Sequence, residues 1–147
     1  MKKKLIYFLL TASVILLIWI IFSVNQPPKW IGISQDGNWK ADYNEETNAP
    51  KGDWIGYLYW ESEGEAKLLG AELRKNGELI HKLEDSGEKL TENENKINYI
   101  HSWEPMFTDS RDELQLKVYW EDEKGEHDAT IDLSPEKRFF VVPKFFK

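Results

Sequence analysis

The chain has 147 residues, no cysteine and a formal net charge of −7 at pH 7. This length leaves room for one domain beside a membrane segment, and the missing cysteine excludes a disulfide scaffold or a lipid-bearing cysteine. All 26 acidic residues follow Val24, whereas three of the 19 basic residues precede it, which leaves 16 basic residues and a formal charge of −10 beyond that point. Such an acidic balance argues against partners such as nucleic acid or anionic lipid.

Residues 5–24 form an apolar run without a charge, and only Thr11, Ser13 and Ser23 in it are polar. A helix of this length, at about 1.5 Å per residue, spans the roughly 30 Å hydrocarbon core of a bilayer. Lysines fill positions 2–4 before the run, and only Lys29 follows it closely. The positive-inside rule therefore predicts a cytoplasmic N-terminus and a C-terminal domain outside the cell membrane.

A cleaved signal peptide is the alternative interpretation, because it also begins with a basic flank. Its apolar region has about 7 to 15 residues and ends in a small-x-small cleavage site. Here the apolar run is longer, and the nearest candidate cut, after Ser23, has Ile21 two positions before it. We therefore expect an uncleaved, single-pass anchor, with cleavage as the second interpretation.

The expected organisation has four parts. They are a cytoplasmic basic flank over residues 1–4, a transmembrane helix over 5–24, an exit linker over 25–29 and one extracytoplasmic domain over 30–147. Two prolines in the linker, Pro27 and Pro28, prevent the helix from continuing and favour an extended exit.

The outer domain alternates apolar and polar residues between turn signals, a pattern that predicts β-strands. The expected strands cover residues 30–33, 39–43, 54–60, 67–75, 78–83, 97–103, 114–120, 129–133 and 139–142. Turn signals every eight to twelve residues or so predict an all-β fold, an antiparallel Ig-like sandwich of about seven to nine strands. We expect Ser134-Pro135 to break one strand and Phe145-Phe146 to form an apolar tail.

The hairpin around Asn76-Gly77 permits two registers. A two-residue loop sets Leu73 opposite Ile80, whereas a three-residue loop over 75–77 sets Leu73 opposite Leu79 and gathers the leucines on one face. Since a slip of one residue exchanges the two faces of a strand, burial favours the three-residue, bulged loop.

Two stretches of the outer domain resemble each other. Leu58-Tyr59-Trp60-Glu61 and Val118-Tyr119-Trp120-Glu121 both lead through an acidic turn with glycine into an alternating strand. This echo fits two hairpins in two halves of a sandwich, and chance similarity is the alternative.

A family resemblance follows from the motifs Trp30-x-Gly, Asn38-Trp39 and Trp54-x-Gly-x-Leu and from the strand over 112–120 with its acidic glycine turn. In these the chain resembles small extracytoplasmic proteins of Bacillus-type, Gram-positive bacteria, which carry an N-terminal anchor or lipid and one β-domain. The resemblance implies this architecture, and it assigns no function and no functional residue. Unlike the lipid-bearing members, this chain has no cysteine.

Catalytic signatures are missing from the sequence, which has no cysteine nucleophile, G-x-S-x-G elbow, phosphate-binding loop or H-E-x-x-H motif. Three histidines, His81, His101 and His127, lie on three different expected strands, so a shared metal site would need the fold to bring them together. The acidic run over 121–123 lacks the glycine spacing of a calcium loop. We therefore expect no cofactor, no metal and no enzymatic activity.

Six of the seven tryptophans lie beyond the apolar run. Their period-two positions predict that Trp39, Trp54, Trp60 and Trp120 fill the core. Trp103, Met106 and Phe107 instead lie at a strand end and in a loop, where binding groups concentrate, and they form the candidate binding surface. Folding of these side chains onto the open end of the sandwich is the alternative.

Three functions remain compatible with these features. The first is a membrane-anchored binding or assembly module that meets another membrane or envelope protein. The second is an aromatic-lined binder of an envelope polymer or carbohydrate, since tryptophan and tyrosine stack well on ligands. The third is a hydrolase, which the missing catalytic motifs disfavour.

Overall fold

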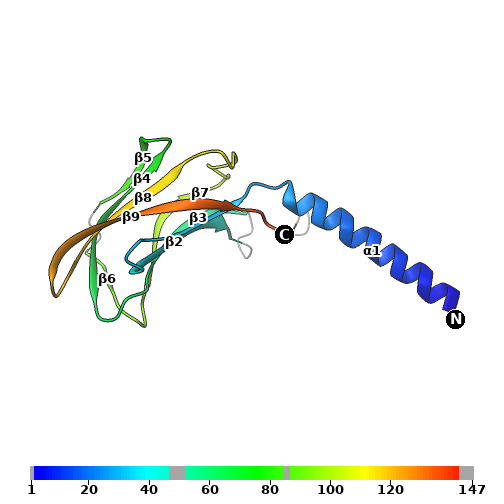
Figure 1. Cartoon of the computed structure of the whole chain (residues 1–147), viewed down its shortest axis with the longest axis horizontal. Helices are drawn as coiled ribbons and strands as arrows, with labels where there is room; N and C mark the ends of the chain where they lie inside the picture. The colour runs from blue at the N-terminus through cyan, green and yellow to red at the C-terminus, as the bar shows by residue number, and fades with distance from the viewer. Residues whose placement is uncertain (1, 47–51, 85–86, 143–147) are drawn as a thin grey trace.

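The computed structural model describes residues 2–46, 52–84 and 87–142. One helix, α1 (Lys2–Val24), precedes an all-β domain and extends away from it (Figure 1). The strands are β1 (Lys29–Ile33), β2 (Trp39–Glu45), β3 (Trp54–Trp60), β4 (Ala66–Lys75), β5 (Glu78–Leu83), β6 (Lys89–Leu90), β7 (Lys96–Ser102), β8 (Leu114–Asp122) and β9 (Gly125–Glu136). The expected all-β domain behind an apolar helix is confirmed.

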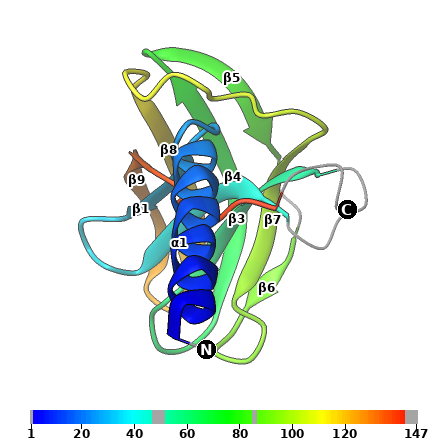
Figure 2. The same ribbon diagram turned by 90° about the vertical axis from the view of Figure 1, so that its right-hand side faces the viewer.

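The strands form one antiparallel sheet in the order β5-β4-β8-β9-β1-β2-β3-β7, with β6 paired to the start of β4. The sheet curls until its end strands β5 and β7 approach each other, so the domain is barrel-like rather than a sandwich of two sheets. Figure 2 shows the strands arranged around a common interior. The Ig-like sandwich is therefore not confirmed, because period-two alternation is the same in a barrel and a sandwich.

Strand β9 connects the strands β5, β4 and β8 on one side of the sheet to β1, β2, β3 and β7 on the other. Its 12 residues pair with β8 from Gly125 to Leu133, and its last three residues pair with β1. At the contact with β1, Gly32 lies so close to the Asp132 carbonyl that a Cβ atom there would be 2.4 Å from its oxygen. Only glycine fits this approach without a shift of the backbone.

The core contains the tryptophans that the alternation predicted. Trp39, Trp54, Trp60 and Trp120 are all buried, together with Leu58 and Val118 from the same two strand patterns. Trp39, Trp60 and Trp120 form one cluster with ring centroids 5.1 to 6.3 Å apart. These three rings fill the end of the barrel that lies farthest from α1.

The expected hairpin register is wrong. Asn76 and Gly77 both have positive φ, 51° and 83°, and form a two-residue turn between Lys75 and Glu78. A bulge lies instead between Leu73 and Arg74, so that Leu73 pairs with His81 and Leu79 faces solvent. The extra residue is therefore Ile80 on β5, whereas the expected loop over 75–77 placed it on the β4 side of the hairpin.

Two other expectations at the C-terminal end are wrong. Strand β9 continues through Ser134-Pro135, because beyond Leu133 it pairs only with β1 and a proline without an N–H group is tolerated on the open side. Residues 139–142 do not form a strand and lie beside the end of α1. The expected apolar tail, Phe145-Phe146, lies outside the described residues.

The internal echo does not correspond to two hairpins. Strands β8 and β9 pair directly, whereas β3 pairs with β2 and β7 and β4 pairs with β5, β6 and β8. The acidic turn after β3 therefore carries the chain across to the other half of the sheet, which sequence similarity alone does not reveal.

Replacement of Trp120 by alanine should lower the free energy of unfolding by about 3 to 5 kcal/mol, because the buried ring leaves a large void. The control is Gln115→Ala on the same strand, whose side chain faces solvent and which should change the free energy by about 0.5 kcal/mol or less. Chemical denaturation measures both. If Trp120→Ala unfolds at the wild-type midpoint, the ring does not belong to the core.

Candidate functional site

The candidate residues from the sequence lie in the loop over residues 103–113, which joins β7 to β8 at the end of the barrel nearest α1. Phe107 is 1% exposed and points inward, with its ring centroid 6.4 Å from that of Trp30 and 4.9 Å from that of Tyr43. This residue therefore contributes to the core at this end of the barrel.

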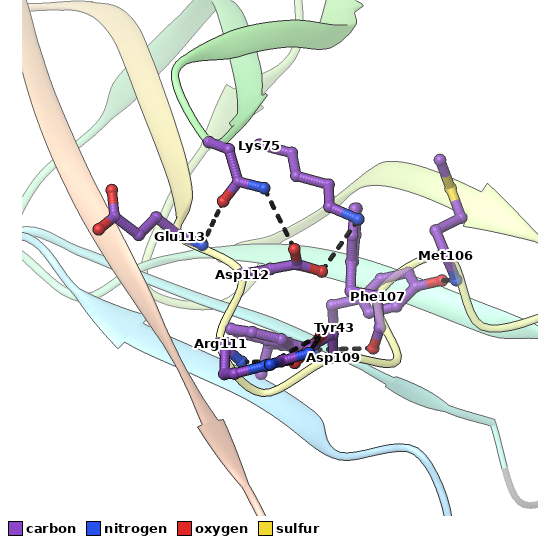
Figure 3. A network of polar contacts seen from close by, with 10 residues as sticks. Tyr43, Lys75, Met106, Phe107, Asp109, Arg111, Asp112 and Glu113 are labelled. Carbon is purple, nitrogen blue, oxygen red and sulfur yellow. Dashed lines mark hydrogen bonds and ion pairs between the residues drawn. The ribbon is translucent and has the colours of Figure 1, made fainter.

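Buried polar contacts hold the loop at both of its inner residues. The Trp30 indole donates to the Phe107 carbonyl at 3.2 Å, and the Met106 amide donates to the Tyr43 hydroxyl at 3.0 Å (Figure 3). The same hydroxyl lies 2.8 Å from the Ser102 hydroxyl. Burial raises the pKa of Tyr43, and the two hydrogen bonds partly oppose it. Tyr43 thus acts as a neutral clamp on the loop.

The outer half of the loop is tied to the hairpin of β4 and β5. Asp112 forms an ion pair with Lys75 at 2.9 Å. The Asn76 side chain donates a hydrogen bond to the Asp112 carboxylate and accepts one from the Glu113 amide. At the tip, Arg111 forms an ion pair with Asp109, and its hydrogen bonds hold the pKa of the Asp109 carboxyl well below its usual range. The exposed ion pair at the tip contributes little stability, whereas the contacts of the half-buried Asp112 and of Asn76 connect the loop to the hairpin.

The structure separates the three candidate residues. Trp103 is 61% exposed and packs edge-on against His101 at 5.5 Å, and Met106 is also exposed. These two side chains keep the accessibility that a binding surface requires, whereas Phe107 supports the loop from inside. The proposed binding role of all three remains a prediction.

A second set of aromatic side chains lies on the outer face of β3, at the positions between its buried residues. Tyr57 and Tyr59 have ring centroids 6.3 Å apart, and the Lys96 ammonium lies 3.5 Å from the Tyr57 ring and 5.7 Å from the Tyr59 ring. Lys40 approaches Tyr59 from the other side at 5.7 Å. We call Lys40, Tyr57, Tyr59 and Lys96 the aromatic–lysine face.

Asp42, on the neighbouring strand β2, orients this face. The Tyr59 hydroxyl donates to one Asp42 carboxylate oxygen at 2.9 Å, and the Tyr57 amide donates to the other at 3.3 Å. Burial and the hydrogen bond to Asp42 raise the pKa of Tyr59 far above its usual value. Tyr59 is therefore a neutral, oriented ring, and its stacking face with lysines on both sides suits a polar or anionic planar group.

The sequence showed that β3 had apolar residues on both faces, but it did not reveal the lysines. They come from strands β2 and β7, and the register that pairs Tyr59 with both Lys40 and Lys96 places them around the ring. His101 and Trp103 continue the outer face of β7 toward the helix end. Predicting these contacts requires the order of the strands in the sheet, and the alternation of apolar and polar residues does not reveal that order.

The three histidines lie on three different strands and have different neighbours. His81 lies on β5, His101 pairs with Asp53 at 3.4 Å, and His127 contacts Asp122 at 2.9 Å. Among residues 2–46, 52–84 and 87–142, no group of three or more His, Cys, Asp or Glu side chains converges as metal ligands would.

The acidic residues concentrate at the end of the barrel farthest from α1. Because the strands alternate in direction, the turns over residues 34–38, 61–65, 91–95 and 121–126 all lie at this end. Together these four turns contain ten acidic residues and one lysine, which accounts for nine of the ten excess negative charges beyond Val24. We call this region the acidic end.

Comparison with protein families, characterised proteins and solved structures finds no match for this chain. The functional conclusion therefore depends on the geometry alone.

Proposed function

We propose that this protein is a single-pass membrane protein whose β-domain, outside the cell membrane, serves as a non-enzymatic binding or assembly module. In this proposal α1 is the uncleaved anchor and the lysines at positions 2–4 keep its N-terminus in the cytoplasm. The helix from Lys3 to Val24 is long and apolar enough to cross a bilayer, a property that signal sequences share.

The observation that carries the proposal is the joint between α1 and the β-domain. The Val141 amide donates to the Ser23 hydroxyl at 3.0 Å, and both residues are buried. Three residues before Val141, the Arg138 guanidinium donates to the Pro27 carbonyl at 2.9 Å and to the Glu45 carboxylate at 2.7 Å. We define the joint as Ser23, Pro27, Glu45, Arg138 and Val141.

This joint supports an anchor over a cleaved signal peptide. A cut after Ser23 would remove the hydroxyl that the Val141 amide contacts and would expose an apolar surface at the start of the domain. Loss of this hydrogen bond to water costs about 0.5 to 1.5 kcal/mol, and the exposed apolar surface adds to that cost, so the contacts favour a chain that keeps its helix.

The surface that we propose for binding is the outer face of β3 and β7, from the aromatic–lysine face to Trp103. Its side chains are partly exposed, held in fixed orientations and rich in the aromatic residues that dominate protein interfaces. The partner that fits best is another membrane or envelope protein, which meets this face beside the bilayer.

An envelope polymer or carbohydrate is the second candidate ligand. Tyr57 and Tyr59 supply neighbouring rings on one face, as sugar stacking requires, and Asp42 contacts both of these residues. The Lys96 ammonium covers the Tyr57 ring at 3.5 Å, so a neutral sugar would have to displace it. An anionic polymer would instead pair with this lysine. A hydrolase is the third and weakest candidate.

The topology predicts which parts of the chain a protease can reach. Protease added outside sealed, right-side-out membranes should remove the β-domain and leave a fragment that contains α1. The mature protein should still begin at or near Met1, as mass spectrometry of the N-terminus would show. Recovery of a soluble form that starts near Asn25 would contradict the anchor.

Membrane cross-linking and pull-down of the full chain should capture a partner through the proposed face. Lys96→Glu and Trp103→Ser should each reduce the captured amount several-fold, since both residues are exposed on that face. The matched control is Leu79→Ser, an exposed apolar residue on β5, which should capture as much as the wild type. Equal loss in all three variants, or none in either test variant, would contradict this face.

A further inference from the structure

The segment over residues 137–142 returns to the helix after β9 and exposes two large apolar side chains there. Phe139 and Phe140 are 68% and 73% exposed, although the rest of the aromatic-rich domain buries most of its rings. Their neighbour Val141 is buried in the joint, which fixes the position of both phenylalanines relative to α1.

The two phenylalanines lie beside the apolar part of the helix rather than beyond its end. The Phe140 ring stacks on Trp19 with centroids 5.5 Å apart and an interplanar angle of 19°. Trp19 precedes Val24 by five residues, which at about 1.5 Å per residue places it roughly 7.5 Å inside the end of α1. Figure 1 shows the described end of the chain next to this part of the helix.

The surface between Phe140 and the helix is apolar. Phe140 and helix side chains from Phe8 to Trp19 line one shallow groove along α1. An apolar surface of this kind, with aromatic rings near the end of a membrane-spanning helix, is suited to contact with lipid.

The charges next to this segment also suit the surface of a bilayer. Lys137 is exposed beside the phenylalanines, and residues 137–142 contain no acidic residue, whereas Arg138 is paired with Glu45 in the joint. The acidic end, on the opposite side of the barrel, carries nine of the ten excess negative charges that argued against contact with anionic lipid. The net negative charge of the domain therefore does not argue against contact between its helix end and a bilayer, because the excess charge lies more than a Debye length away at the other end.

We propose that Phe139 and Phe140 form a second membrane contact, inserted into the outer leaflet beside α1, with Lys137 at the lipid headgroups. This inference rests on the proposed anchor and deepens it. Interfacial aromatic segments bury about 5 to 10 Å into the headgroup and acyl boundary, which matches the depth of Trp19. The contact holds the helix end of the barrel on the bilayer and directs the acidic end away from it.

The absence of cysteine allows a direct test with site-specific labels in the full chain. Single variants Phe139→Cys and Phe140→Cys receive a nitroxide spin label, and the protein is placed in vesicles of phosphatidylcholine and phosphatidylglycerol. Ile33→Cys is the matched control, because Ile33 is 63% exposed but lies at the far end of β1. Leu16→Cys, within α1, reports whether the helix itself is in lipid.

Labels at positions 139 and 140 should be accessible to oxygen and several-fold less accessible to a water-soluble nickel chelate than the label at position 33. If position 16 reports lipid but 139 and 140 behave like 33, the second contact is wrong and the anchor stands. If position 16 also reports water, the anchor itself fails. Two label positions are used so that local disturbance of the Trp19 stack at 140 does not decide the result.

Discussion

The buried ion pair between Arg138 and Glu45 is the constraint on which the arrangement of helix and domain depends. Its side chains are only 10% and 8% exposed, so both charges are largely removed from water. Such burial is costly unless the pair is close and further hydrogen bonds satisfy the guanidinium. Here the ion pair measures 2.7 Å, the Pro27 carbonyl accepts a second bond at 2.9 Å, and the Trp54 ring faces the guanidinium at 4.9 Å. The pair contributes geometry more than stability, because few other positions satisfy all three contacts.

This pair orders the helix end of the domain, whereas the direction of the strands sets the position of the acidic end. At one end it orders the segment that joins β9 to the helix, which brings the Val141 amide to Ser23 and the Phe140 ring to Trp19. At the other end, the alternating strands carry the acidic turns to the opposite side of the barrel. We expect a domain held in this way to keep one orientation relative to α1. That would set the height of the outer face of β3 and β7 above the helix, as the proposed assembly role requires.

The sequence predicted what depends on local periodicity and missed what depends on long-range pairing. Alternation located the buried tryptophans and most strands because each buried face repeats every second residue. It did not distinguish a barrel from a sandwich, place the bulge at Leu73, or foresee that β9 changes partner at Pro135. Phe107 entered the core because Trp30 and Tyr43, distant in sequence, lie beneath it. Arg138 resembled an ordinary surface charge, since nothing near it in the sequence indicates Glu45 as its partner.

Pulsed electron spin resonance tests most directly whether α1 and the β-domain form one unit. Spin labels at Leu9→Cys in the helix and Glu123→Cys in the acidic end report their separation in the full chain, reconstituted in lipid nanodiscs. We expect a single narrow distance distribution, which broadens when Arg138→Ala removes the central contact of the joint. A broad distribution in the chain with Arg138 intact would contradict the account, because the domain would then move freely on a flexible linker.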